Sequence, residues 1–169
     1  LYEFMNVWIT NVSTSKFAGV NTLWAAIMRE DFIPDRVHLI ADEMVKEKGY
    51  LAAALKGYQC VLNRYGNEEE PIVHDVVETE FADLAKKLES IVHEEKTKGH
   101  TVAIDMTPGR KYMSAFAMYM GVGADVKHRA DRIYYLHVKG LKNHTGQPYS
   151  MVPSNLMTLY DLKKEILGE

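Results

Sequence analysis

The sequence predicts an α/β domain in which helices cover both faces of a mainly parallel sheet of five to six strands. Short runs rich in β-branched and aromatic residues alternate with longer segments whose apolar residues recur at helical spacing. The chain has 169 residues, of which 47% are hydrophobic and 25% charged, so disorder is disfavoured. A chain of this length suits one domain with a sizeable core, and we expect residues 1–169 to form it.

In chain order, the first half is expected to form a strand at 6–10, a helix at 21–30, a strand at 36–40, a helix at 44–64 and a strand at 72–77. Pro34 precedes the second strand and disfavours helix at that point. Gly66 ends the long helical pattern, as glycine often does after a helix. The acidic turn at 67–70 then separates this helix from the third strand.

The second half is expected to form a helix at 80–98, a strand at 101–104, a helix at 110–122, a strand at 132–138 and a helix at 156–167. For the first of these helices, Thr79 is the expected N-cap and Gly99 the stop. Its apolar residues follow the spacing of one buried face: Phe81, Leu84, Ala85, Leu88, Ile91 and Val92. A polar segment at 140–150 separates the last strand from the last helix.

Charge and cysteine content restrict the functional classes. The formal net charge is −3 and the cations are interleaved with carboxylates, which argues against a duplex DNA-binding surface. A local basic pocket for a small anion remains compatible with this charge. Cys60 is the only cysteine, which excludes an intrachain disulfide and favours a reducing cytoplasm. It falls on an apolar helical pattern and is expected to be buried.

No apolar run approaches the ~20 residues that a membrane-spanning helix needs, and no signal peptide is visible. The chain begins with Leu1, which leaves two alternatives open. Residues 1–4 are a cloning remnant before a start at Met5, or the domain is a fragment of a longer effector. In the second case, a fused effector domain or a membrane segment lies outside this sequence.

The turn after the fourth strand carries the strongest chemical signal. Asp105 ends the strand, and Thr107, Pro108 and Gly109 lead directly into a helix that begins with Arg110 and Lys111. Free backbone N–H groups at a helix start bind anions, and glycine lets a ligand approach the backbone closely. Two cations in a first turn oppose the helix dipole by about 0.3–1 kcal/mol each, a conflict that a bound anion would remove. The alternative is an ordinary turn with solvated cations.

The helix after this turn carries Met113, Phe116, Ala117 and Met120 on one face, which is a core pattern. Ser114 lies one turn from the two cations and is expected at the rim of the pocket. The loop after the first strand is also rich in polar side chains: Thr10, Asn11, Ser13, Thr14, Ser15 and Lys16. Because the carboxyl ends of parallel strands meet at one edge of a sheet, both loops are expected to contact one phosphate-bearing ligand.

Other catalytic and metal-binding patterns are absent from the sequence. There is no Walker motif, no Gly-x-Gly-x-x-Gly, no Gly-x-Ser-x-Gly and no HExxH among the seven histidines. We therefore expect no metal site and no cofactor. His38, His74 and His137 fall in or beside strands and are expected in the core or at an edge, whereas His128 is expected on a solvated surface.

The segment from Thr101 to Ser114 resembles the signature of CARF domains, the CRISPR-associated Rossmann-fold sensors. In that family a strand ends in Asp-x-Thr and is followed by a glycine-containing turn, a lysine and a helix with Met-Ser near its start. The corresponding residues here are Asp105, Thr107, Gly109, Lys111 and the pair Met113-Ser114. Two features depart from the family pattern: Pro108 replaces a common second glycine, and the first loop lacks the Gly-Thr-Ser form.

The resemblance implies a Rossmann-like fold and a homodimer that binds one cyclic oligoadenylate, most often cyclic tetra-adenylate, the second messenger of type III CRISPR systems. It implies that Thr107, Gly109, Arg110 and Lys111 hold phosphates. Asn11, Ser13, Thr14 and Ser15 would then meet ribose or phosphate from the other side. A two-fold ligand suits a two-fold interface, because the same surface patch serves both halves.

Three functions remain open at this stage. The first is a sensor that passes ligand binding to an output such as a nuclease, a DNA-binding domain or a membrane segment. The second is a metal-independent ring nuclease, in which Lys111 or Arg110 stabilises the transition state and Ser13 or Ser15 orients the ribose. The third is an α/β enzyme acting on a phosphorylated ligand outside CRISPR biology, which would need an acid–base pair in the pocket.

Overall fold

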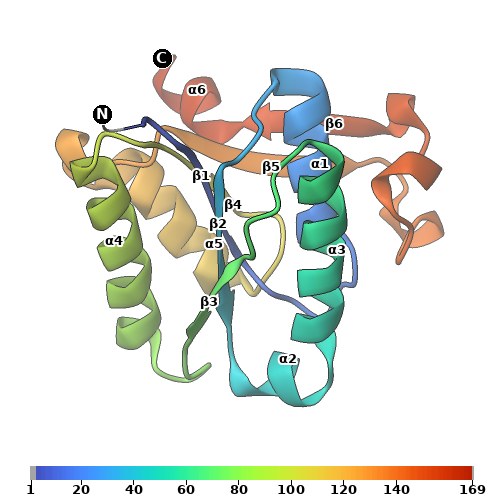
Figure 1. Ribbon diagram of the computed structural model, residues 1–169, viewed down its shortest axis with the longest axis horizontal. Coiled ribbons are helices and arrows are strands. Elements are labelled where there is room, and N and C mark those ends of the chain that lie inside the picture. Colours follow the sequence, from blue (N-terminus) through green and yellow to red (C-terminus); the bar gives the residue numbers. More distant parts are fainter. Residues whose placement is uncertain (1–2, 169) are drawn as a thin grey trace.

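A computed structural model describes residues 3–168 of the chain (Figure 1). Six strands form one sheet in the order β3-β2-β1-β4-β5-β6. The strands are β1 (Asn6–Asn11), β2 (Arg36–Ala41), β3 (Ile72–Asp75), β4 (Thr101–Asp105), β5 (Arg132–Val138) and β6 (Met157–Asp161). All neighbouring strands run parallel except β5 and β6, which are antiparallel. The α/β class and the mainly parallel sheet expected from the sequence are confirmed.

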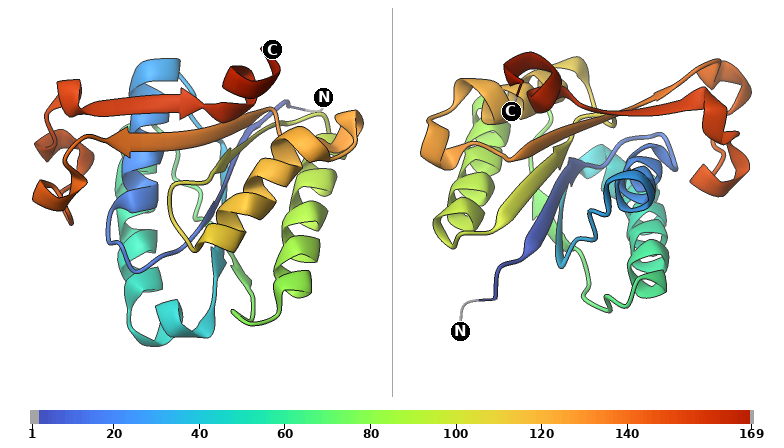
Figure 2. Two further views of the ribbon diagram at one scale, coloured as in Figure 1. Left: turned by 180° about the vertical axis from the view of Figure 1, so that it is seen from behind. Right: turned by 90° about the horizontal axis from the view of Figure 1, so that it is seen from above.

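Helices cover both faces of the sheet, as Figures 1 and 2 show. The helices are α1 (Ala18–Glu30), α2 (Glu43–Glu47), α3 (Tyr50–Arg64), α4 (Phe81–Thr97), α5 (Lys111–Met118) and α6 (Leu162–Leu167). Helices α1 and α3 pack on one face, where the core includes the fully buried Trp8 and Tyr134, whose rings stack 5.6 Å apart. Helices α4 and α5 pack on the other face, against Ile9 and Ile104. The core therefore lies in two layers separated by the sheet.

Three expected helices differ from those observed. The continuous helix at 44–64 was wrong, because the chain breaks between α2 and α3 at Gly49, whose φ of 77° favours glycine. The helix at 156–167 was also wrong at its start, since residues Met157–Asp161 pair with β5 as β6 and only Leu162–Leu167 are helical. Helix α5 ends at Met118 and continues as a π-helical turn at Tyr119–Gly123.

Two local predictions were also wrong. Cys60 is exposed rather than buried, because it lies on the outer side of α3. Thr79 is not the N-cap of α4: Glu80 takes that position and makes no side-chain capping bond. Among the histidines expected in strands, His38 is buried in β2 and His74 is half-buried in the edge strand β3, whereas His137 is exposed on β5.

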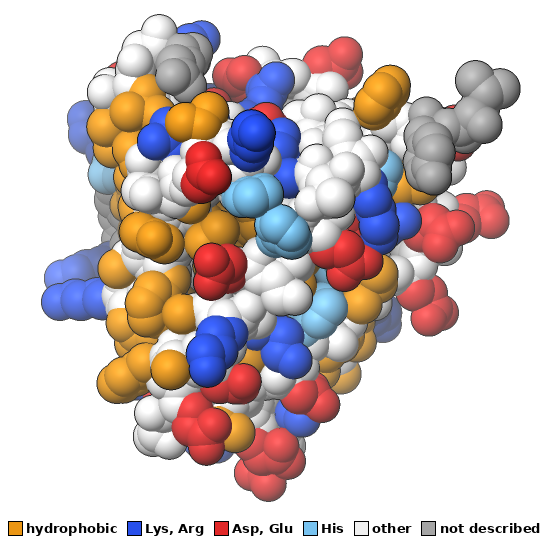
Figure 3. Space-filling model, turned by 90° about the vertical axis from the view of Figure 1, so that its left-hand side faces the viewer, with side chains coloured by type: hydrophobic (Ala, Val, Ile, Leu, Met, Phe, Trp, Pro, Cys, Tyr) orange, Lys and Arg blue, Asp and Glu red, His pale blue; other side chains and the backbone are white. Residues whose placement is uncertain are grey.

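The surface over α4 carries cations and carboxylates interleaved with histidines (Figure 3). Apolar side chains gather along one side of the same view. Two exposed apolar residues are Phe81, at the start of α4, and Tyr119, just after the end of α5. Within residues 3–168, the structure contains no helix long and apolar enough to cross a membrane. The parallel strands place their carboxyl ends at one edge of the sheet, and the loops that follow β1, β4 and β5 meet there.

Candidate functional site

Asp105 anchors the turn that follows β4. Its side chain is fully buried, and one carboxylate oxygen accepts a hydrogen bond from the Thr107 backbone N–H at 2.8 Å. The other oxygen lies 3.5 Å from the hydroxyl of Thr10 at the end of the neighbouring strand β1. Burial raises the pKa of Asp105 to about 7, while hydrogen bonds from Thr107, Thr22 and Thr10 oppose that rise. Asp105 thus lies below the turn and joins it to the first loop.

The Thr107 side chain fixes the turn to two other elements. Its hydroxyl accepts a hydrogen bond from the Leu136 N–H of β5 at 2.9 Å and lies 3.0 Å from the Thr22 hydroxyl of α1. Gly109 follows with a φ of 105°, a conformation that residues with side chains rarely adopt. A Cβ at this position would lie 3.0 Å from the Met113 sulfur and 3.4 Å from the Cβ of Asn11. The turn therefore needs glycine for both its backbone and its packing.

The two cations at the start of α5 have different surroundings. Arg110 precedes the helix in an extended conformation and forms an ion pair with Glu78. Lys111 is the first residue of α5 and is exposed. Neither residue lines the cavity described next. Glu78 thus offsets one of the two positive charges that the sequence placed against the helix dipole, and both cations are exposed.

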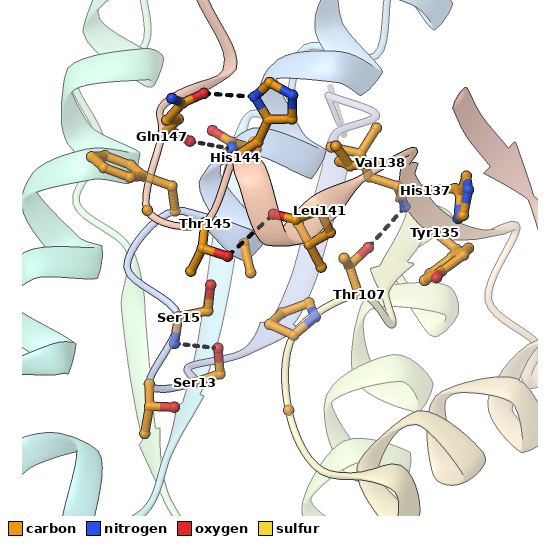
Figure 4. A pocket seen from close by; sticks show the side chains of 18 residues that line it. Ser13, Ser15, Thr107, Tyr135, His137, Val138, Leu141, His144, Thr145 and Gln147 are labelled. Atoms are coloured by element: carbon orange, nitrogen blue, oxygen red, sulfur yellow. Dashed lines mark hydrogen bonds between the residues drawn. The ribbon is translucent and has the colours of Figure 1, made fainter. Parts of the chain in front are cut away.

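A cavity of about 510 Å³ opens where the three loops meet (Figure 4). Six residues expected to bind the ligand line it: Ser13, Thr14, Ser15, Thr107, Pro108 and Gly109. The Ser15 N–H donates to the Ser13 hydroxyl at 3.2 Å, so the first loop turns both side chains toward the cavity. The structure therefore brings together the two loops that the sequence paired.

The remaining expected ligand residues lie elsewhere. Thr10 and Asp105 are buried beneath the loops. Asn11 and Lys16 line an adjacent cavity of about 10 Å³, and Lys16 lies 5.2 Å above the Phe17 ring. Ser114 donates its hydroxyl to the Met106 carbonyl at 3.1 Å and thereby stabilises the turn. Direct contact between a ligand and Asp105 or Thr10 would require these loops to open, so the geometry gives both residues a supporting position.

The opposite wall of the cavity was missed by sequence reasoning. It is formed by the end of β5 and the 3₁₀ turns after it, with polar side chains from His137, His144, Thr145 and Gln147. His144 Nδ1 lies 2.9 Å from the Gln147 side-chain oxygen. Since Gln147 Oε1 can only accept, His144 donates from Nδ1. The signal was available, because the polar segment 140–150 follows a strand that ends at the same edge as β1 and β4.

This wall is held against α1 by specific contacts. The Asn21 side-chain amide donates to the Gln147 carbonyl at 2.9 Å. Arg29 donates to the carbonyl groups of Met157 at 2.8 Å and Ser154 at 3.2 Å. The rings of Trp24 and Tyr149 stack 5.7 Å apart. Helix α1 therefore positions the segment between β5 and β6 as well as the start of the first loop.

The composition of the cavity indicates which chemical groups it can accept. Among the described residues that line it, none is Asp, Glu, Lys or Arg. Hydroxyl, amide and imidazole groups alternate with the apolar surfaces of Phe17, Tyr135 and Leu141. Such a mixture suits an uncharged, planar group with hydrogen-bonding edges, for example a nucleobase with its ribose. Because these residues carry no fixed positive charge, negative charge on the same molecule would have to be met outside the lining, and the start of α5 with the exposed Lys111 follows the turn directly.

Comparison with protein families identifies one relation. The family described as CRISPR-associated protein NE0113 matches residues 27–166, which is most of the chain. The chain belongs to this family. The match includes β4, the turn from Asp105 to Lys111 and the wall after β5, but it begins within α1 and so excludes the first loop. A comparison with curated proteins gives no match.

A solved structure has the same fold as this member of the NE0113 family. It is Enterococcus italicus Csm6 bound to cyclic hexa-2′-fluoro-hexa-dAMP, with a TM-score of 0.57 and 14% sequence identity. The alignment covers 96% of this chain but 43% of that chain, so the chain spans less than half of Csm6. The CRISPR-associated family and the shared fold together confirm the resemblance to CARF domains, and the chain is a CARF-like domain.

Proposed function

We propose that this domain binds a cyclic oligoadenylate, specifically cyclic tetra-adenylate, as the sensor of a type III CRISPR ancillary effector. Binding is passed to an output domain that this chain does not include. The proposal is supported by the CRISPR-associated family and by a structural neighbour, Csm6, that is bound to a cyclic oligoadenylate analogue. The observation that carries it is the meeting of the Thr107–Gly109 turn and the Ser13–Ser15 loop at one cavity whose described lining residues include no Asp, Glu, Lys or Arg.

The two parts of the site divide the ligand between them. Adenine and ribose enter the cavity, where His144 and Gln147 offer hydrogen bonds and Phe17 and Leu141 offer apolar surface. Phosphates meet the N–H groups of the turn and the ammonium group of Lys111. Glu78 already offsets part of the charge of Arg110, so the effect of Arg110 on affinity is expected to be smaller than that of Lys111.

A homodimer completes this arrangement. A cyclic ligand with two-fold symmetry binds across a two-fold interface, so that each protomer supplies one cavity. Exposed apolar side chains support such an interface: Phe81, at the start of α4, is 53% exposed, and Tyr119, just after the end of α5, is 57% exposed. Phe81 and Tyr112 pack 4.7 Å apart beside the start of α5. Sedimentation of the purified domain, with and without ligand, tests this part of the proposal.

The binding proposal is tested by calorimetric titration with cyclic tetra-adenylate, using cyclic hexa-adenylate and linear tetra-adenylate for comparison. Lys111→Ala is expected to weaken binding about tenfold or more, because a charge-assisted phosphate contact is lost. Lys127→Ala, a cation in the exposed turn at Val126–His128, is the matched control for net charge. No heat with any of the three ligands, or equal affinities for the two variants, would contradict the proposed site.

A ring nuclease is the second candidate, because the Ser13 and Ser15 hydroxyls both face the cavity. In that reaction a ribose 2′-hydroxyl loses its proton and attacks the adjacent phosphorus. The bond to the 5′-oxygen breaks, and that oxygen takes up a proton, which leaves a 2′,3′-cyclic phosphate and a 5′-hydroxyl. A serine would orient the ribose, and Lys111 would stabilise charge on the phosphorane-like transition state.

Chromatography of labelled cyclic tetra-adenylate after incubation in a chelator distinguishes the two candidates. Linear products that disappear in Ser15→Ala, while calorimetric binding persists, would establish the nuclease. An intact ring after long incubation with stoichiometric protein would leave the sensor as the function. Ser154→Ala, outside the cavity, is the matched control for a loss of hydroxyl.

A further inference from the structure

The proposed anion site lies directly above a buried acid. Asp105 is 0% exposed, and its carboxylate accepts the backbone N–H of Thr107, a residue that lines the cavity. Among residues 3–168, Asp105 takes part in no ion pair within 4.0 Å. An ionised Asp105 would therefore be an uncompensated negative charge beneath the turn that the proposed phosphates contact. Like charges in one site disfavour both ionisation of the acid and binding of the anion.

The partners of Asp105 suit a carboxyl group that gains and loses a proton. They are the hydroxyls of Thr10, Thr22 and Thr107, together with one backbone N–H. A hydroxyl can donate to a carboxylate, or rotate and accept from a carboxylic acid. The Thr107 N–H bond at 2.8 Å can persist in both states, since the unprotonated oxygen still accepts it. An arginine or lysine in the same place would have fixed the charged form.

We propose that cyclic oligoadenylate binding is coupled to proton uptake at Asp105, which becomes a neutral positioning residue beneath the bound phosphates. This inference rests on the proposed function and adds a regulation of the same site. Burial raises the pKa of Asp105 to about 7 in the free protein, so small changes in its surroundings alter its protonation near neutral pH. Ligand phosphates raise that pKa further, and affinity for the ligand consequently rises as pH falls.

The other titratable groups around Asp105 do not account for such an effect. Tyr58 of α3 faces it, and burial raises the Tyr58 pKa well above 10. Tyr134 is its register partner on β5, and burial raises that pKa to about 12. Thr22 from α1 and Thr10 and Trp8 from β1 complete the surroundings and do not titrate. His137 and His144 also line the cavity, so the experiment must separate their effects from those of Asp105.

The test is calorimetry with cyclic tetra-adenylate at pH 7.5 in two buffers that differ in ionisation enthalpy, which counts the protons taken up. A unit negative charge about 10 Å from Asp105, at an effective dielectric constant of about 20, raises the proton affinity of Asp105 about tenfold. Ligand binding at pH 7.5 should therefore take up about half a proton per protomer. Affinity should then be about tenfold higher at pH 6 than at pH 9. Asp105→Asn should bind the ligand and lose this proton uptake, whereas the His137→Gln/His144→Gln variant should retain it.

A second measurement covers the case in which Asp105→Asn does not fold. Carbon-13 NMR of the wild-type carboxyl groups should show the Asp105 pKa rising when ligand saturates the protein. An unchanged or lower pKa, or full proton uptake in a folded Asp105→Asn variant, would overturn the proton coupling and leave ligand binding intact. The absence of binding heat at every pH would instead overturn the proposed function, and this inference with it.

Discussion

Replacing Asp105 with asparagine should change how the stability of the free protein depends on pH. Burial raises the pKa of Asp105 from 3.8 to about 7, so the folded state holds its proton more tightly than the unfolded chain. The resulting stabilisation is fully present below pH 3.8 and is lost as pH rises through about 7. Between pH 5 and pH 7, each pH unit removes about 1.4 kcal/mol, which gives a loss of about 3 kcal/mol.

Urea unfolding of wild type and Asp105→Asn at pH 5 and pH 8 measures this effect. Asparagine has nearly the same shape as aspartic acid and carries no charge, so the variant should lack this pH dependence of stability. Its free energy of unfolding relative to wild type should therefore rise by about 3 kcal/mol from pH 5 to pH 8. This double difference cancels the contributions of groups that are common to both proteins. Asp125→Asn, a change at an exposed carboxylate, is the control and should follow wild type. Parallel pH profiles for wild type and Asp105→Asn would refute the inference of a protonated buried acid.

Three further perturbations test other parts of the structure. Gly109→Ala should destabilise the fold by about 1–2 kcal/mol and weaken ligand binding, because φ is 105° and a Cβ would lie 3.0 Å from the Met113 sulfur, which would have to shift. Tm and calorimetry check this, and a neutral effect would contradict the turn geometry. Arg29→Ala should increase amide hydrogen exchange in residues 149–157 and leave β1 and β4 protected, because Arg29 donates hydrogen bonds to Met157 and Ser154. An equal increase in exchange throughout the chain would argue against Arg29 as a local anchor. Burial lowers the pKa of His38 below 6.5, so the stability that neutral His38 provides is present above pH 6.5 and is lost as pH falls. His38→Gln should therefore flatten the decline of Tm between pH 7 and pH 5. An unchanged slope would exclude His38 as the source of that decline.

The sequence predicted the sheet and half of the site because both depend on local signals. Buried strands such as 101–104 are continuous apolar runs, and the turn at Thr107–Gly109 combines residues with specific backbone preferences. Two polar loops that follow parallel strands must lie at the same edge, so their proximity followed from topology alone. Ser13, Ser15 and Gly109 were thus placed at the cavity correctly.

The errors arose where long-range contacts outweigh local preference. Residues 157–161 alternate apolar and polar side chains, but they were assigned to a helix together with the helical residues that follow them. They form a strand because they pair with the edge of β5. The ion pair of Arg110 with Glu78 was not expected, because it depends on a loop more than thirty residues away in sequence. The wall containing His144 was missed because hydrogen bonds from α1 determine its position. None of these contacts has a signature within a short window of sequence.

The segment between β5 and β6 lies outside the parallel sheet and is tied to α1 mainly through Arg29, Asn21 and Trp24. Insertions or deletions there would reshape one side of the cavity, while the turn after β4 and its buried acid kept their geometry. Under the proposed function, selectivity for the size of a ligand would therefore change without loss of the turn proposed to contact its phosphates. A graft of the 140–154 segment between relatives is then expected to exchange the preference for ring size and to leave that turn unchanged.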